Sequence, residues 1–144
     1  MANWFECKVR YEKLQENGSV KKVNEPYLVD ALSFTEAEAR ITEEQTPFIS
    51  GEFNISAIKP TKISEIFWYE GGDRWYLVKV AFITIDEKTA AEKRSISQIL
   101  VQACNFRQAF ENFEEGMKGT MADYEIVSIN ETPLMDVYKM KVVE

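Results

Sequence analysis

The chain has 144 residues, of which 45% are hydrophobic and 12% aromatic, enough for a packed core and too many for a disordered chain. Its formal net charge of −7 argues against a general nucleic-acid binder, because that affinity comes largely from Lys and Arg side chains that neutralise phosphates. The sequence has no histidine, which excludes nucleophiles activated by histidine and metal sites built on imidazole.

The first elements read as a β-hairpin. Residues 4–12 alternate between apolar and polar side chains, which predicts a strand with one face in contact with solvent. Asn17-Gly18 predicts a tight turn, because both residues tolerate positive φ. The returning strand covers about 20–32, and Pro26 predicts an edge or a bulge there, since proline cannot donate to a strand ladder.

A capped helix follows this hairpin. Ser33 and Glu36 have the spacing of a capping box, so we expect a helix from residue 34 to about Gln45. Two further strands are predicted at 52–59 and 63–69, joined by a turn at Pro60.

Residues 70–73, Glu-Gly-Gly-Asp, form a flexible polar junction in the middle of the chain. The segment is short and has strand patterns on both sides, so it predicts a hairpin loop. The alternative is a hinge at Gly71-Gly72 between two small, separate subdomains.

The second half of the chain repeats the pattern of the first, including a second cap at Asn105 followed by Gln108. Matched pairs include Trp4/Trp75, Val9/Val80, Leu28/Leu100, Val29/Val101, Phe34/Phe106, Ala37/Ala109, Ile55/Ile126 and Phe67/Tyr138. The matches indicate a duplication rather than chance.

The predicted fold class is therefore α+β, with an internal duplication of a β-β-α-β-β unit. We expect one or two antiparallel sheets with both helices packed on one side. The whole chain, 1–144, is predicted to be a single domain built of two repeats, 3–69 and 74–142, joined at 70–73.

The two cysteines have no metal-binding spacing. Cys7 matches Val78, and Cys104 matches Leu32 in the other repeat. Because each replaces an aliphatic residue, both are predicted to be small buried thiols, and a disulfide or a reactive thiol is the alternative.

Asp30 and its match Gln102 each stand in an apolar strand pattern, which suggests a polar slot kept in both repeats. A buried charge there would need a partner. The plainer interpretation of Asp30 is an edge-strand carboxylate that reaches water.

Trp68, Tyr69 and Trp75 surround the central junction and are candidate anchors for a partner or a stacked base. Core packing or cross-strand pairing is the alternative role for them. Lys93 and Arg94 are candidates for a phosphate contact, although mixed charge at a hairpin tip is usually solvated surface.

Leu77, Ala81 and Ile83 make the second face of one strand apolar, where the first repeat has charged residues. They are predicted to contact either the first repeat or another subunit, and a homodimer is the expected assembly.

Three stretches resemble a known family: EPYLVDALSFTEAEARI, DEKTAAEK at Asp86–Lys93, and ETPLMDVYK at Glu131–Lys139. Through them nearly the whole chain resembles an uncharacterised domain family of Bacteroidales-type bacteria and their phages. No activity, ligand or catalytic residue is established for that family, so no site residue is carried over. The resemblance implies a bacterial or phage-derived cytoplasmic protein.

The sequence favours binding over catalysis. Without histidine an enzyme would rely on carboxylates, lysines, tyrosines or thiols, and their pattern shows no catalytic arrangement, metal spacing or phosphate-binding glycine loop. We expect no catalytic residues, no metal and no cofactor. The function expected is a protein-interaction or regulatory module, of the kind that a phage or mobile element carries, whose acidic surface suits a basic groove of another protein. The alternative is a metabolite- or nucleotide-binding protein that uses a groove between the repeats.

No apolar run approaches the roughly 20 residues that span a bilayer. The opening stretch MANWFECKVRYEK also lacks the order of a secretion signal. We therefore expect a soluble, cytoplasmic protein.

Overall fold

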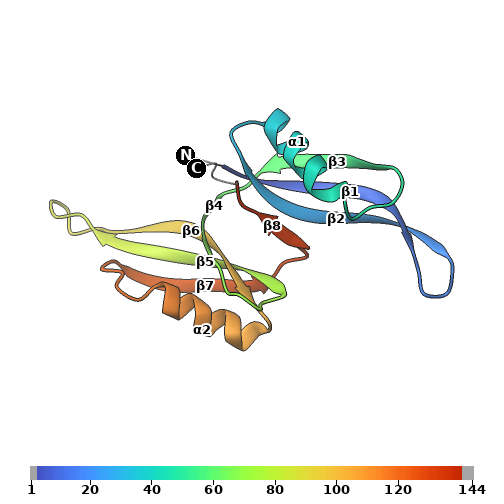
Figure 1. Cartoon of the computed structure of the whole chain (residues 1–144). Coiled ribbons are helices and arrows are strands. Elements are labelled where there is room, and N and C mark those ends of the chain that lie inside the picture. Colours follow the sequence, from blue (N-terminus) through green and yellow to red (C-terminus); the bar gives the residue numbers. More distant parts are fainter. Residues whose placement is uncertain (1–2, 141–144) are drawn as a thin grey trace, which may run out of the picture. The chain divides into compact units, whose positions relative to one another are not determined.

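The computed structural model describes residues 3–140, which contain eight strands and two helices (Figure 1). The first half of the chain contributes β1 (Asn3–Leu14), β2 (Val20–Ala31), α1 (Phe34–Gln45), β3 (Phe53–Pro60) and β4 (Ile63–Phe67). The second half contributes β5 (Arg74–Ile85), β6 (Glu92–Ala103), α2 (Phe106–Gly116), β7 (Asp123–Glu131) and β8 (Asp136–Tyr138).

These elements form two compact units. Unit 1 consists of the described residues up to Thr61 together with those from Pro133 onward, and unit 2 is Lys62–Thr132. Each unit has one four-stranded sheet and one helix. The strand order is β3-β1-β2-β8 in unit 1 and β4-β6-β5-β7 in unit 2. The prediction of a single domain over 1–144 concerns how the units associate, and it stays a prediction.

The last strand of each repeat belongs to the unit built by the other repeat. β4 follows β3 in the chain but pairs with β6 in unit 2, with Ile66 opposite Leu100. β8 follows β7 but pairs with β2 in unit 1, with Val137 opposite Leu28. Both pairings are parallel, whereas the other strand pairs are antiparallel. We call β4 and β8 the exchanged strands.

The duplication extends to local detail. The register slips between Lys8 and Val9 in unit 1, and between Lys79 and Val80 in unit 2. The Thr61 hydroxyl donates to the carbonyl oxygen of Trp4 at 2.8 Å, and Thr132 makes the same bond to Trp75 at 2.8 Å. The α+β fold class and the repeated β-β-α-β-β order are therefore confirmed.

Both predicted helix caps are present. The Ser33 side-chain oxygen accepts the N–H of Glu36 at 3.2 Å, and the Asn105 side chain accepts the N–H of Gln108 at 2.9 Å. In the second cap the Gln108 side-chain oxygen reaches the N–H of Cys104, at 2.6 Å, one residue before the cap.

Each helix covers one face of its own sheet. In unit 1 the core contains Phe5, Cys7, Val9, Val29 and Ile41. In unit 2 it contains Val78, Val80, Ile99, Phe113 and Met117. The alternation predicted for the first strand is confirmed, because Phe5, Cys7 and Val9 point into this core.

The predicted hairpin at 70–73 is wrong. β4 and β5 are not neighbours, because β6 lies between them in the sheet. The segment instead makes a turn in which the Gly72 N–H donates to the Tyr69 carbonyl oxygen at 3.0 Å. Pro26 lies immediately before the three residues of β2 that pair with β8, and its carbonyl oxygen accepts the N–H of Met135 at 2.8 Å.

Candidate functional site

A comparison of matched positions reveals where the two units differ in chemistry. Four polar side chains in unit 1 stand where unit 2 has apolar ones. The pairs are Tyr11/Phe82, Tyr27/Ile99, Gln45/Met117 and Tyr138/Phe67. In unit 2 all four residues pack into its core or directly against it. In unit 1 all four line a pocket.

Tyr11 is held at the end of the inward face of β1 by an acidic partner. Its hydroxyl donates to Glu25 Oε1 at 2.5 Å, and Glu25 comes from the neighbouring strand β2. Lys13 approaches Glu25 Oε2 at 3.9 Å, but its side chain is 52% exposed, so this pair is weak. The Glu25 side chain is only 14% exposed.

Gln45 and Tyr138 connect the end of α1 to the exchanged strand β8. Gln45 is the last residue of the helix and is 2% exposed, and its Nε2 donates to the Tyr138 hydroxyl at 3.0 Å. The Tyr138 ring stacks on Tyr27 of β2, with centroids 5.9 Å apart and an interplanar angle of 16°. A buried amide is tolerated here because it has this partner.

These residues line an open depression that we call the tyrosine pocket, with a volume of about 310 Å³. Its lining is Tyr11, Lys13, Glu25, Tyr27, Gln45, Phe48, Met135, Asp136 and Tyr138. Burial, the bond to Glu25 and the charge of Glu25 raise the pKa of Tyr11 to about 12. Burial also raises the pKa of Tyr27 and of Tyr138, and the charge of Asp136 adds to both shifts. The phenols therefore stay protonated at neutral pH.

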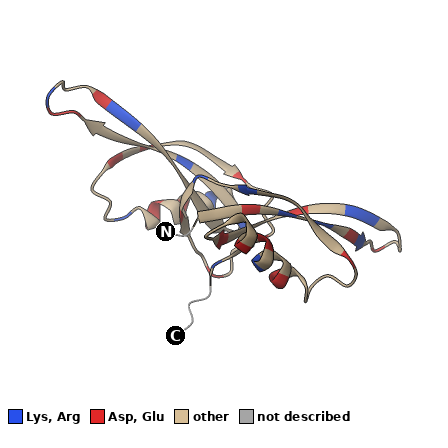
Figure 2. Cartoon of the chain, turned by 90° about the horizontal axis from the view of Figure 1, so that it is seen from above, with Lys and Arg blue, Asp and Glu red and all other residues tan. Residues whose placement is uncertain are grey.

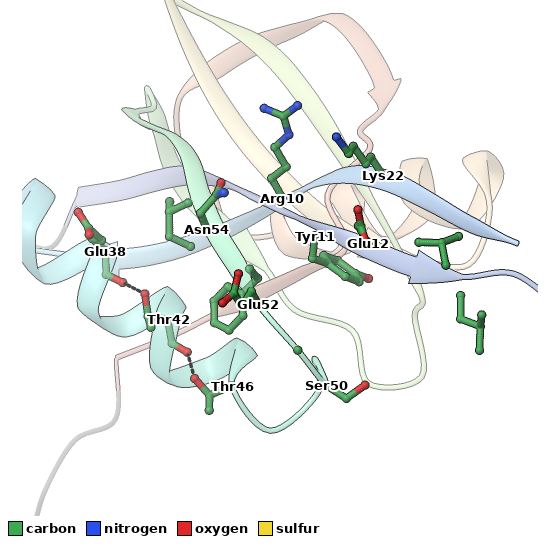
Figure 3. Close-up of a pocket in the computed structure, with 15 residues that line it drawn as sticks. Arg10, Tyr11, Glu12, Lys22, Glu38, Thr42, Thr46, Ser50, Glu52 and Asn54 are labelled. Atoms are coloured by element: carbon green, nitrogen blue, oxygen red, sulfur yellow. Dashed lines mark hydrogen bonds between the residues drawn. The ribbon is translucent and has the colours of Figure 1, made fainter.

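A larger opening, which we call the groove, lies alongside and shares Tyr11 with the tyrosine pocket (Figure 3). It measures about 1370 Å³ and extends from the C-terminal half of α1 across the start of β3 to the β1–β2 hairpin. The lining is Arg10, Tyr11, Glu12, Leu14, Val20, Lys22, Glu38, Thr42, Thr46, Ser50, Gly51, Glu52, Phe53, Asn54 and Ile55.

Figure 3 shows the two kinds of wall in the groove. Glu38, Thr42 and Thr46 follow one another along α1, and Arg10 and Lys22 come from the hairpin strands. The hydroxyls of Thr42 and Thr46 donate to backbone carbonyl oxygens one turn earlier in the helix, at 2.8 and 2.7 Å. The hydroxyls of the helix wall are therefore engaged within the helix, and Glu38 is the charged residue of this wall.

The predicted polar slot exists in both units, and it holds the chain after each exchanged strand. Asp30 is 6% exposed, and Arg40 donates to its Oδ1 at 2.6 Å and to its carbonyl oxygen. Arg40 also donates to the Lys139 carbonyl oxygen, just after β8, at 3.0 Å. The prediction that Asp30 is an edge-strand carboxylate that reaches water is therefore wrong, because Arg40 of α1 covers it.

Gln102 plays the matching part in unit 2. Its side-chain oxygen accepts the Tyr69 N–H at 3.0 Å, and its Nε2 donates to the Gly72 carbonyl oxygen at 2.8 Å. These bonds fix the chain directly after β4, which is why β4 ends at Phe67 rather than at Tyr69. Asp30 and Gln102 thus lie in different units, and each has internal partners.

The three predicted aromatic anchors all lie in unit 2, but their exposure differs. Trp68 is 48% exposed and Tyr69 39%, whereas Trp75 is only 2% exposed. The Trp68 ring contacts Trp75 edge-on at 5.5 Å, and the Tyr69 hydroxyl accepts Gln108 Nε2 at 3.2 Å. Trp68 and Tyr69 are therefore accessible to a partner, whereas Trp75 is a core residue that packs against Trp68.

Lys93 and Arg94 lie near the start of β6, where the long hairpin carries charges of both signs (Figure 2). Arg94 pairs with Glu125 of β7 at 2.9 Å, with both side chains about half exposed. Because Glu125 already neutralises the charge of Arg94, Arg94 attracts a phosphate only weakly.

The cysteine prediction is correct for one residue only. Cys7 is fully buried, and burial, with a smaller effect of Glu6, raises the pKa of its thiol to about 11. Cys104 is exposed and free, so its prediction as a buried thiol is wrong. Cys104 follows the last residue of β6, at the bend before α2. Its match Leu32, at the same bend in unit 1, is exposed as well, at 66%.

The proposed dimer residues differ in burial. Ala81 is buried, whereas Leu77 and Ile83 are half-buried. The homodimer through these residues stays a prediction.

The tyrosine pocket and the groove were missed by reasoning from sequence, although a signal was present. The four polar-for-apolar differences between matched positions are visible once the repeats are superposed. Within residues 3–140, no group of three or more acidic or cysteine side chains is arranged to hold a metal ion. Neither helix, over the same range, is long and apolar enough to cross a membrane.

A family model with the description "Domain of unknown function (DUF4494)" matches residues 3–140. No curated protein and no solved structure matches the chain. The match covers nearly the whole chain and confirms the resemblance to an uncharacterised domain family. The chain therefore belongs to the DUF4494 family, a domain family of unknown function.

Proposed function

We propose that the protein is a non-catalytic interaction module that binds an extended segment of a partner protein in the groove of unit 1. The observation that carries the proposal is the position of the groove beside an open sheet edge. β3 is the outermost strand of its sheet, and its residues 53–55 line the groove together with Glu52 just before them. An extended segment can add to such an edge through main-chain hydrogen bonds.

A second open edge lies at the hairpin, on β1. β3 pairs with β1 only as far as Tyr11, opposite Phe53. Residues 12–14 of β1 pair with β2 but lie beyond the end of β3. The edge of β1 at these residues is therefore also open, one strand position further in than the outer edge of β3.

The side chains of the groove suit a segment with apolar and basic residues. Phe53, Ile55 and Tyr11 give an apolar wall, and Leu14 and Val20 are 71% and 58% exposed at the hairpin. Glu38 and Glu52 lie on the α1 and β3 side, where they can pair with Lys or Arg of the partner. A basic partner segment also complements the net charge of −7.

The matching surface of unit 2 is built differently. Within residues 3–140, Phe53 and its match Tyr124 are both half-buried against the core of their unit, but of the two only Tyr124 has ring contacts there, with Phe113 at 6.0 Å and Phe82 at 6.3 Å between centroids. Thr42 is matched by the exposed Glu114 on α2. These differences favour unit 1 as the binding unit.

Selection of displayed random peptides against the full chain tests the proposal. Enriched peptides are expected to be extended and basic-apolar, and to shift the backbone amide signals of β3 in an NMR titration. Thr42→Arg places a cation at the groove wall and is expected to weaken binding at least tenfold. Glu114→Arg, at the matched position of unit 2, is the control and should leave binding unchanged.

Three results would overturn the proposal. One is the absence of any enriched peptide, and another is an equal loss of binding in both variants. The third is a set of peptides that shift the signals of Trp68 and Tyr69 instead, which would favour the aromatic surface of unit 2 as the site.

A further inference from the structure

The tyrosine pocket has a composition that points to a ligand of its own. Four of its nine lining residues are aromatic, two are acidic and one is basic. Its volume of about 310 Å³ is at the lower end for small-molecule sites and suits a compact group.

We propose that the tyrosine pocket binds an organic ammonium ion, held by its aromatic walls and the carboxylates of Glu25 and Asp136. Aromatic faces attract cations through their quadrupole, and several rings around one opening are the usual means of recognising alkylated ammonium groups. Glu25 of β2 is bonded to Tyr11 of β1 and lies two residues before Tyr27 on its own strand. Asp136 of β8 lies opposite Tyr27.

Glu25 is arranged to receive such a cation. The Tyr11 hydroxyl fixes its Oε1 at 2.5 Å, which leaves Oε2 with the long contact of 3.9 Å to Lys13. Because the Lys13 side chain is half exposed, a cation entering the pocket can displace it at little cost. The carboxylates that raise the pKa of Tyr27 disfavour a phenolate, and the same negative potential favours a bound cation.

Other ligand classes fit the pocket less well. An anion would meet two carboxylates against one lysine. Among the described residues no group of three acidic or cysteine side chains is placed to hold a metal ion, and the two carboxylates of the pocket are fewer oxygen ligands than a hard metal ion requires. An organic cation uses the rings as well as the charges.

The comparison with unit 2 supports a ligand over a structural role. Met117, Ile99 and Phe67 fill the matching place with apolar side chains that pack together. The fold is therefore complete without polar groups there. Phe48 in unit 1 lines the pocket yet is 76% exposed, as expected for a wall whose contact is not with the protein itself.

Choline and its neutral carbon isostere, 3,3-dimethylbutan-1-ol, are matched probes for the test. In NMR titrations of the full chain, choline is expected to shift the signals of Tyr11, Tyr27, Gln45 and Tyr138 saturably. The isostere has the same shape without the charge, and it should bind at least tenfold more weakly. Added salt should weaken choline binding but not binding of the isostere.

Two variants and a control complete the experiment. Glu25→Gln keeps the shape of the side chain and should weaken choline binding at least tenfold. Phe48→Leu changes an exposed ring, so it should lower the affinity without affecting folding. Glu65→Gln, at the position in unit 2 that matches Asp136, should have no effect.

The proposal fails if choline gives no saturable shifts, or if the isostere binds as tightly as choline. It also fails if Glu25→Gln binds choline like the unaltered chain. These results do not depend on any peptide binding in the groove, so the two proposals stand or fall separately.

Discussion

Unit 1 and unit 2 share their strand order, their β-bulge and their helix caps, but they join the helix to the exchanged strand in different ways. In unit 2 the joint is apolar, with Phe113 of α2 and Phe67 of β4 at 6.1 Å between ring centroids. In unit 1 the joint is polar, with Gln45 of α1 bonded to Tyr138 of β8. The same backbone therefore accepts two kinds of packing.

The difference shows where the duplicated fold is tightly packed and where it leaves an opening. Gly116 lets α2 approach β4 so closely that a Cβ atom there would lie 2.5 Å from the Phe67 ring. Its match in unit 1 is Glu44, and there the space is bordered by polar side chains and a pocket. The joint of unit 2 is thus tightly packed with apolar side chains, whereas the joint of unit 1 has fewer apolar contacts and an opening.

The largest effect is expected from the clamp that holds each exchanged strand. Arg40→Ala leaves Asp30 buried without its partner and removes the bond to Lys139, so unit 1 should lose about 3–5 kcal/mol. Asn112 matches Arg40 and donates one bond, at 3.0 Å, to the Gln102 carbonyl oxygen. Asn112→Ala should cost unit 2 only about 1 kcal/mol.

Hydrogen exchange measures the two losses separately, because it reports the opening free energy of each unit. Equal losses of opening free energy in Arg40→Ala and Asn112→Ala would contradict the difference drawn between the two units. They would mean that the charged clamp of unit 1 contributes no more than a single neutral bond.

The contact of Gly116 with Phe67 gives the second effect. Gly116→Ala forces the Phe67 ring to move, and the expected cost is about 1–3 kcal/mol in unit 2 in spite of the better helix propensity of alanine. The matched variant Glu44→Ala should stay within about 0.5 kcal/mol. Urea unfolding followed at Trp68 and Trp75 measures the cost of Gly116→Ala. A stabilisation by this variant would show that the joint is not tightly packed.

The smallest expected effect is a difference in stability between the two units at alkaline pH, measured between pH 8 and about 9.5. The pKa of the Cys7 thiol is raised from 9.0 to about 11, and that of Tyr11 from 10.0 to about 12. The unfolded chain therefore loses these protons first, and the folded state binds more protons above pH 9. The stability from these groups is complete below pH 9 and is lost as the pH rises through 11 to 12.

The matching residues of unit 2, Val78 and Phe82, do not ionise, so unit 1 should open first as the pH rises. Cys7→Val copies unit 2 at this position and should reduce the slope of unit 1 stability against pH. Hydrogen exchange at pH 8 and 9.5 in reducing buffer checks this prediction. A slope unchanged by Cys7→Val would assign the effect to the tyrosines alone.

Local signals predicted the elements of this fold well. Ser33 and Asn105 are placed as caps because capping is a matter of a few neighbouring residues. The alternation of Phe5, Cys7 and Val9 predicts their burial for the same reason. The pairing of β4 with β6 was not predictable in this way, because residues 63–67 have the same strand pattern whichever sheet they join.

The candidate site depends on distant contacts in the same way. Tyr138 is only a strand residue in the sequence, and it acquires its role by lying beside Tyr27 and Gln45. Asp30 was identified as polar in an apolar run, but its partner Arg40 lies on the helix that follows, and no local pattern indicates that bond. The repeat comparison is the only sequence signal that marks this region.

The exchange of β4 and β8 also sets the order in which the units can be finished during synthesis. Unit 2 is continuous, so all of it is available as soon as Thr132 leaves the ribosome. The sheet of unit 1 has to wait for Asp136, and until then residues 27–29 of β2 have no β8 beside them. At roughly 5–20 residues per second, that edge stays open for some seconds while residues 62–132 are translated. A nascent chain from which Thr132, but not yet Asp136, has emerged would thus carry a complete second unit and an N-terminal sheet with an open strand edge, and this interval is the one in which that edge is most exposed to pairing with another chain.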